Sequence, residues 1–558
     1  MRLAPPLPSG FLLGVALLSS RAVQAQDGTW ALTNARIETV TRGTIQKGTI
    51  VIRNGLIEAV GTNVTPPSDA RVVDLTGRTV YPGLIDLTSS MGLPAPTGGG
   101  GGFGGGGGGG GGQSAAQSGG GPRYVGLEPA RLVANEVNPS ATDLRAARDA
   151  GITAALVAPT RGAFRGLSAL VPMDEDSAAH KVVRSPVGLH MGFQGVGGRY
   201  PATLLGVIAY ERQQLYDAQR HAAMLDRYRS NPRGAARPSY DADLDALVPV
   251  VRGQLPAFFA ASNENEIRRA LDIAKEFDLK VTVVGATEGF RAVEALKASG
   301  RPVVVSVEFP NAATVTGWQY RGAQRRELND SATRDAAVKR LVEGNAALLH
   351  QAGIRFALAS GTLRPNDFLA NVRKAIAAGL PRQAALEALT IRAAEIAGAE
   401  NQLGSIETGK IANLVVTQGD LLSENPQIRM VFVDGAGHEV VAAPRGTGTR
   451  AAGGGGPMAQ VAGTWAVTVS SPQGEMPSTL TLTQSGDAVD GTMTSQFGTV
   501  SVSEGRVQGR TLTWSMSMTV GGQTLQMTAE AEVEGDRMTG RLRTGEMGTM
   551  TFTAERRP

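Results

Sequence analysis

The sequence predicts an α/β protein built around an eight-fold (β/α)8 barrel, followed by a separate all-β antiparallel barrel. Two observations carry this prediction. Buried strand patterns alternate with helical patterns between residues 140 and 398, as expected of parallel strands joined by helices. After residue 461 no helical period remains, and short alternating strands are separated by glycine-containing turns.

Length and composition limit the possible functions. The chain has 558 residues, is 42% hydrophobic and has a formal charge of +4, so it can bury two or three cores. No basic run suggests nucleic-acid binding. Cysteine is absent, which excludes disulfides and a lipid-anchored cysteine.

The first 25 residues predict an export signal. Arg2 supplies a positive charge, residues 11–18 are apolar, and Val23-Gln24-Ala25 has the small-residue pattern of a cleavage site. The apolar part is too short to span a bilayer. We expect cleavage after Ala25 and a periplasmic or secreted protein without a membrane span.

The segment from Thr29 to Val80 predicts antiparallel strands. Residues 30–37 and 48–53 alternate in polarity, Asn54-Gly55 is a hairpin turn signal, and residues 56–61 form the return strand. The stretch from Thr79 to Ser90 then predicts one buried strand with Pro-Gly at its entry.

A glycine-rich segment, 98–121, follows this strand. It lacks the Lys-Ser/Thr ending of a phosphate loop, and its glycines favour disorder. The cap pattern of Ser140 and Asp143 begins the next helix. Further expected elements are strands 152–158, 186–191, 255–260, 280–284, 301–307 and 354–359, and helices 204–228, 263–277, 290–298, 331–352, 368–379 and 380–398. The helix 204–228 is amphipathic, with an apolar face of Leu204, Leu205, Ile208, Leu215, Leu225 and Tyr228.

Two motifs resemble the amidohydrolase superfamily, in particular its imidazolonepropionase-like exported branch. The first is Pro82-Gly83-Leu84-Ile85-Asp86, which in the family leads into a His-x-His pair. The second is Gly409-Lys410-Ile411-Ala412-Asn413-Leu414, where the family usually has Asp in place of Asn413. The resemblance spans about residues 29–442. It implies a β-sandwich from 26–80 and 400–442, a barrel from 81–399, a linker from 443–461 and a lipocalin-like β-barrel from 462–558.

The resemblance also implies hydrolysis of carbon–nitrogen bonds other than peptide bonds by a zinc-type divalent ion. Its histidine and aspartate ligands lie on strands one, five, six and eight. The positions that match are Thr88 and Ser90 on strand one, Gly285 on strand five and Leu363 after strand eight. None has a metal-binding side chain. We therefore predict no bound metal or other cofactor and no catalytic residue of the family type.

The remaining chemistry gives weaker candidates. His190 with Glu308 and Glu288 is the best alternative metal cluster, and Ser89, Ser90 and Ser360 are possible nucleophiles by location alone. A ligand pocket at the barrel mouth is expected to contain the following polar residues: Thr88, Ser90, His190, Ser306, Glu308, Thr362, Gln194, Arg199 and Tyr200.

Three functions remain open. The chain is a catalytically degenerate member that binds a small molecule or forms a dimer, with itself or with an active homologue. Alternatively it is an active amidohydrolase with a non-standard site. As a third possibility, the C-terminal β-barrel is the ligand-binding module, and the rest of the chain only carries it. The methionines of that barrel favour a packed core over a ligand pocket.

Overall fold

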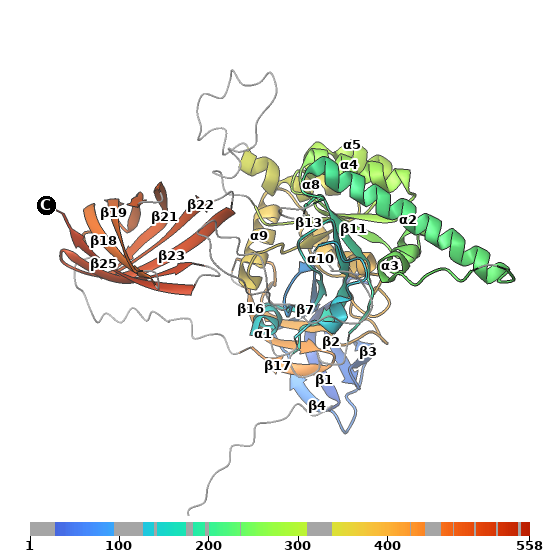
Figure 1. The fold of residues 1–558 in the computed structure, drawn as a ribbon. Coiled ribbons are helices and arrows are strands. Elements are labelled where there is room, and N and C mark those ends of the chain that lie inside the picture. The colour runs from blue at the N-terminus through green and yellow to red at the C-terminus, as the bar shows by residue number, and fades with distance from the viewer. Residues whose placement is uncertain are drawn as a thin grey trace, which may run out of the picture. The chain divides into compact units, whose positions relative to one another are not determined.

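The computed structural model divides the chain into two compact units, Met1–Ala442 and Ala443–Pro558 (Figure 1). It describes residues 28–93, 126–138, 142–174, 182–195, 200–234, 236–309, 338–424, 426–440, 459–471, 474–495, 498–520, 523–544 and 548–557. The predicted export signal, the glycine-rich segment, Ser140, His180, Arg199 and most of the predicted linker lie outside these residues.

Both ends of the first unit contribute to one mixed sheet of eight strands. Its order is β17-β16-β15-β5-β1-β2-β3, and β4 pairs with β1. The strands are β1 (Trp30–Glu38), β2 (Thr44–Arg53), β3 (Leu56–Gly61), β4 (Arg71–Asp74), β5 (Thr79–Pro82), β15 (Leu414–Gln418), β16 (Gln427–Val433) and β17 (Ala436–Glu439). The strands expected to form a sandwich are thus hydrogen-bonded as a single composite sheet.

The turn between β2 and β3 has the conformation that its sequence predicts. Asn54 and Gly55 have φ angles of 51° and 78°, and a two-residue turn of this type requires positive φ at both positions. Asn413 connects the two halves of the sheet, because its Oδ1 accepts a hydrogen bond from Asp434 N (2.8 Å) and its carbonyl accepts one from Gly83 N (2.8 Å). An asparagine therefore suffices where the family usually has aspartate.

The stretch from Thr79 to Ser90 is two strands, and the prediction of one continuous strand was wrong. β5 pairs with β1 and β15 in the composite sheet, whereas β6 (Leu84–Ser89) pairs with β7 in the barrel. Gly83 lies at the break. A Cβ there would come within 2.0 Å of Thr153 Oγ1, so only glycine lets the chain pass from one sheet to the other.

The barrel has eight strand positions, and the third runs opposite to the others. Strands β10 to β14 are parallel in one sheet, and β6 and β7 are parallel in another. Between them, β9 pairs antiparallel with β7 and β8 pairs antiparallel with β10. The strands are β7 (Ile152–Val157), β8 (Phe164–Leu167), β9 (Ala169–Pro172), β10 (Leu189–Gly192), β11 (Ala257–Ala261), β12 (Val281–Gly285), β13 (Val303–Ser306) and β14 (Phe356–Ala359).

The reversed segment was not predicted, and it changes the strand count. Ser168 joins β8 to β9. Its N–H donates a hydrogen bond to Gly188 O, and its carbonyl accepts one from Val187 N, in the segment before β10. With this segment counted, β11 is the fifth position and β12, which ends at Gly285, is the sixth. Gly285 therefore ends the sixth barrel strand and not the fifth, to which the sequence analysis had assigned it. Neither β11 nor β12 contains a histidine.

Helices pack around the barrel and largely follow the prediction (Figure 1). They are α1 (Thr142–Asp149), α2 (Leu204–Ser230), α3 (Ala242–Val251), α4 (Glu264–Glu276), α5 (Val293–Ser299), α8 (Asn345–Gln351), α9 (Pro365–Ala377), α10 (Arg382–Leu389) and α11 (Ile391–Ala397). Asn263 and Glu266 form a capping box at the start of α4. The helix predicted over 331–352 is interrupted at Gly344 within its described part.

Helix α2 buries only part of the apolar face predicted for it, since Leu215 is buried and Ile208, Leu225 and Tyr228 are half-buried. Leu204 and Leu205 are 39% and 80% exposed. Glu211 and His221 are titratable residues among the buried positions, which are Val207, Glu211, Leu215, Ala218, His221 and Ala222. Within the described residues, no helix is both long enough and apolar enough to cross a bilayer.

The second unit is a closed antiparallel barrel of eight strands, as predicted. Its strands are β18 (Gly463–Ser471), β19 (Gly474–Ser485), β20 (Ala488–Ser495), β21 (Gly498–Gln508), β22 (Thr511–Val520), β23 (Gln523–Glu534), β24 (Arg537–Thr544) and β25 (Gly548–Arg556). Trp465, Trp514 and Phe552 fill its interior together with Met516 and Met538. The internal cavity beside Trp514 and Phe552 measures about 10 Å³, which is barely the space of one water molecule.

Candidate functional site at the ends of the barrel strands

Asp86 bridges the seam between the first and last barrel strands. Its carboxylate is fully buried and accepts hydrogen bonds from Ser360 N (3.0 Å), Ser360 Oγ (2.5 Å) and Thr88 N (3.2 Å). Burial raises the pKa of the Asp86 carboxyl, and the hydrogen bonds from Ser360 and Thr88 act in the opposite direction. Because Asp86 lies on β6 and Ser360 follows β14, this carboxyl group joins two strands that share no ladder hydrogen bonds.

The hydroxyl groups predicted for a ligand pocket extend the same seam. Thr88 Oγ1 accepts a hydrogen bond from Gly361 N at 3.0 Å. Glu308 accepts hydrogen bonds from Thr362 N (3.2 Å) and Thr362 Oγ1 (2.5 Å), and its own N–H donates to Ser306 Oγ (3.1 Å). The structure thus brings together Thr88, Ser306, Glu308 and Thr362, as predicted. Their side chains, however, form hydrogen bonds that link β6, β13 and the loop after β14.

Gly361 is required where these groups meet. Its φ is +67°, and a Cβ would lie 2.7 Å from Glu308 Oε2 and 2.8 Å from Ser306 Oγ. The loop after β14 therefore fits closely against Glu308 and Ser306 at this position, while the side chains of Glu308 and Thr362 remain exposed.

The other matched metal positions are unsuited to ligation. Ser90 is exposed, and Leu363 packs on the core between the barrel and its helices. Gly285 has φ +99°, and a Cβ there would lie 2.9 Å from Ser262 Oγ, so a histidine at this position would be strained. Gln194 Oε1 accepts a hydrogen bond from Gly162 N (3.3 Å), and Tyr200 is 67% exposed.

His190 lies in a second cluster, and no hydrogen bond or ion pair joins it to the Asp86 seam within the described residues. Its ring is stacked on Phe258 with centroids 5.0 Å apart. It is 6% exposed, and its Nε2 has no hydrogen-bond partner. Burial, reinforced by the positive charge of Arg165, lowers the pKa of His190 to about 3.

Two charged groups missed by the sequence analysis complete this cluster. Arg165, on the unpredicted β8, donates through Nε to Gly162 O (3.1 Å), and burial lowers its pKa to about 10 despite the nearby carboxylates. Glu211 on α2 is completely buried, and neither carboxylate oxygen has a hydrogen-bond partner among the described residues. Burial raises the pKa of Glu211 well above its usual value, while the charge of Arg165 opposes the shift.

A divalent metal ion does not fit either cluster. In the first, Asp86 and Thr88 already accept hydrogen bonds from Ser360 and Gly361 in the loop after β14. In the second, the Arg165 guanidinium repels a cation near His190, and metal ligation requires the opposite electrostatics. Glu288, proposed as a partner of His190, instead accepts a hydrogen bond from Glu264 N (3.0 Å) at the start of α4. Throughout the described ranges, no three His, Asp or Glu side chains gather as a metal site would require.

The missed residues had partial signals in the sequence. Glu211 lies four residues after Val207 and four before Leu215, so it shares the face that α2 buries. Asp86 is a charged residue within an apolar strand, which is itself a signal of a buried polar contact. Arg165 had no signal that could be used, because the strand on which it lies was not predicted.

The sequence profile described as the amidohydrolase family matches residues 250–437. This range begins after the Pro-Gly-Leu-Ile-Asp motif, includes β11 to β16 and ends within β17. No curated protein matches the chain.

Among solved structures, an amidohydrolase from Thermotoga maritima is similar, with 23% identity and a TM-score of 0.57. The match covers 73% of this chain and 98% of that one, and at this identity it establishes the fold alone. Molinate hydrolase (14% identity, TM-score 0.43, 75% and 96% covered) is also similar. So is an adenosine deaminase from Xanthomonas campestris (15% identity, TM-score 0.40, 73% and 92% covered).

Proposed function

Because residues 250–437 belong to the amidohydrolase family, we propose that this chain is a non-hydrolytic member that acts by binding. Its role is that of a small-molecule-binding protein or of a partner subunit for an active homologue. The observation that carries the proposal is the seam of Asp86, Thr88 and Ser360. In this seam the groups at the metal-binding end of the barrel are hydrogen-bonded to one another and to backbone.

Electrostatics supports the same proposal. Hydrolysis by this family depends on an ion that lowers the pKa of water from about 16 to about 7. Replacing that advantage requires a strong general base with access to substrate. His190 has a pKa lowered to about 3 and is a weak base, and the Asp86 carboxylate is fully buried under three hydrogen bonds.

The packed interior of the second unit makes its barrel an unsuitable site for an organic ligand. The cavity of about 10 Å³ is far smaller than ordinary ligand sites, which measure roughly 300–1,000 Å³. The first unit is therefore the better place for a binding role.

A hydrolysis assay with added metal tests the proposal. The full chain, without a histidine tag, is incubated with cyclic amides and N-acyl amino compounds in the presence of Zn²⁺ or Mn²⁺. We expect no turnover above that of buffer containing the metal. Metal-dependent turnover that is abolished in both Asp86→Asn and His190→Phe variants would overturn the proposal and indicate an enzyme with a non-standard site.

The partner role has its own test. Co-expression with an adjacent-gene amidohydrolase that retains His-x-His should give a co-purifying complex of defined stoichiometry by light scattering. A monomeric chain that remains separate from such a homologue would contradict the partner role and leave ligand binding as the function.

We also propose that the protein works outside the cytoplasm, in the periplasm or beyond it. The proposal rests on the charged, apolar and small-residue pattern of residues 1–25. Amino-terminal sequencing of protein from the extracytoplasmic fraction should begin at Gln26, and an intact amino terminus in a cytoplasmic fraction would contradict it.

A further inference from the structure

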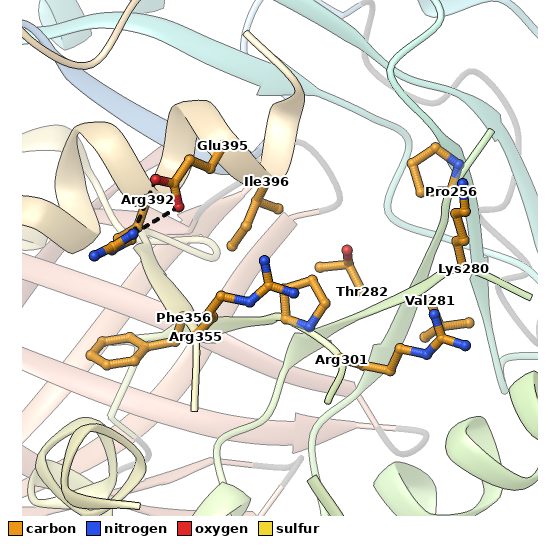
Figure 2. A pocket seen from close by; sticks show the side chains of 11 residues that line it. Pro256, Lys280, Val281, Thr282, Arg301, Arg355, Phe356, Arg392, Glu395 and Ile396 are labelled. Carbon is orange, nitrogen blue, oxygen red and sulfur yellow. Dashed lines mark hydrogen bonds and ion pairs between the residues drawn. The ribbon is translucent and has the colours of Figure 1, made fainter. Parts of the chain in front are cut away.

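A cavity at the amino-terminal ends of the barrel strands is lined by an excess of positive charge. It measures about 250 Å³ and lies at the opposite ends of the strands from the Asp86 seam. Basic residues precede three consecutive strands: Lys280 precedes β12, Arg301 precedes Pro302 and β13, and Arg355 precedes β14. Figure 2 shows Lys280 and Arg301 on one side of the cavity, Arg392 and Glu395 on the other, and Arg355 between them.

Most of this charge is uncompensated. Arg392 pairs with Glu395 (3.0 Å) and with Glu387 (3.4 Å). In the described parts of the chain, the side chains of Lys280, Arg301 and Arg355 make no ion pair or hydrogen bond. The cavity lining therefore holds four cations and one carboxylate, and that carboxylate is already paired.

The backbone that carries these cations is fixed by the sheet. Ala257 N donates to Lys280 O (2.8 Å), Val303 N donates to Arg355 O (3.0 Å), and Val283 N donates to Pro302 O (3.1 Å). Because these bonds belong to the parallel ladder, the Cα positions of the basic residues are held by the barrel itself. Only the side chains must become ordered when a ligand binds, and this lowers the entropic cost of binding.

A buried hydroxyl group provides a second, independent feature of a binding site. Thr282 on β12 is 4% exposed and lines the cavity, where Figure 2 shows it between Arg355 and Lys280. No hydrogen bond of its hydroxyl is found in the described structure, and Oγ1 is not among the unpartnered atoms that are fully sealed from solvent, so it is open to the cavity. A nearly buried polar group without a partner is unusual unless water or a ligand oxygen supplies one. Apolar surface from Pro256, Phe356 and Ile396 completes the lining.

We propose that this cavity binds a small organic phosphate. A phosphate group carries about two negative charges and three acceptor oxygens, which suits several cations and a hydroxyl better than a single carboxylate does. Arginine forks bind phosphate in a bidentate manner. The apolar lining takes a compact organic group, since the volume is slightly below that of ordinary ligand pockets. This inference names a ligand class for the small-molecule-binding role proposed above, and it does not depend on the absence of hydrolysis, because it concerns the other end of the barrel and requires no catalysis.

Calorimetric titration of the full chain at low salt tests the proposal, with phenyl phosphate as the ligand and benzoate as its carboxylate counterpart. We expect saturable binding of phenyl phosphate with one site per chain, weakening as NaCl is raised, and weaker binding of benzoate. Arg355→Gln and Thr282→Val should each reduce the affinity by about tenfold, because each removes a hydrogen bond to a charged group.

Arg220→Gln is the matched control. Arg220 is an exposed arginine of α2 outside the cavity, so its removal lowers the net charge equally without touching the site. Its affinity should equal that of the unaltered chain. The proposal fails if phenyl phosphate does not bind at millimolar concentration, if benzoate binds as tightly, or if Arg220→Gln weakens binding as much as Arg355→Gln. Circular dichroism at 222 nm confirms that each variant is folded.

Discussion

Replacing Asp86 tests whether the seam between β6 and β14 holds the barrel closed. Asp86→Ala leaves the N–H groups of Ser360 and Thr88 without their acceptor, while the Ser360 hydroxyl can rotate to another partner. Each hydrogen bond to a charged group is worth about 1.5–3 kcal/mol. The variant also no longer has the free-energy cost of keeping a carboxylate away from water, which offsets part of this loss. We therefore expect a net loss of unfolding free energy of about 2–4 kcal/mol.

Asp86→Asn is the matched control, because it retains the geometry without the charge. Its Oδ1 can accept from both N–H groups, and its Nδ2 can donate to Ser360 Oγ. We expect a change of about 1 kcal/mol or less. Urea unfolding of the full chain at pH 7, followed at 222 nm, reports on the first unit, since every described helix lies there. Hydrogen exchange in β6 and β14 should rise selectively in the alanine variant.

The contribution of Asp86 to stability should change with pH in a definite direction. Burial raises the pKa of Asp86 in the folded state, so the folded chain binds the proton more tightly than the unfolded chain. Stability relative to Asp86→Asn should therefore fall as the pH rises from the ordinary aspartate value through the raised folded value. An alanine variant as stable as the unaltered chain, or a difference from asparagine that does not change with pH, would refute this account.

Other substitutions test the rest of the site. As the pH falls from 7 to 4.5, the unfolding free energy of the unaltered chain should fall by about 2–3 kcal/mol relative to that of His190→Phe. The unfolded imidazole binds a proton in this range, whereas the folded one, with a pKa of about 3, does not. Equal urea unfolding curves for the two chains at both pH values would contradict this. Gly285→His should cost about 1–3 kcal/mol through its φ of +99° without creating a metal site, and zinc-dependent stabilisation of this variant would show the reverse. Trp465→Ala removes a fully buried ring and should lower the unfolding free energy of the second unit by about 3–5 kcal/mol, as measured by limited proteolysis. The unfolding transition of the first unit at 222 nm should stay unchanged. A shift in that transition would mean that the two units unfold together.

Local signals in the sequence predicted much of the fold. The Asn54-Gly55 turn, the Asn263–Glu266 capping box and the alternating strands of the second unit depend on neighbouring residues, and all appear as expected. The break at Gly83 was missed because the close approach comes from Thr153, which is 70 residues further along the chain. The reversed third strand was missed because its antiparallel pairing with β7 and β10 depends on the tertiary arrangement of the barrel and not on neighbouring residues.

The site was only partly predictable for the same reason. Thr88, Ser306, Glu308 and Thr362 were expected to line an open pocket and do lie together, but their hydrogen bonds join β6, β13 and the loop after β14. Such partners cannot be assigned from one strand at a time. Arg165 acts on His190 from a strand that was not predicted, and Glu211 acts on Arg165 from a helix that had not been placed beside it.

Zinc stoichiometry is the most direct test of the central claim that this barrel end is held by strand-to-strand hydrogen bonds and has no metal-binding role. The tag-free full chain is equilibrated with Zn²⁺, dialysed against metal-free buffer and measured by elemental analysis, with an intact His-x-His amidohydrolase alongside. We predict far less than one zinc per chain while the homologue retains its metal. One tightly held equivalent, lost when Asp86 or His190 is replaced, would contradict the account.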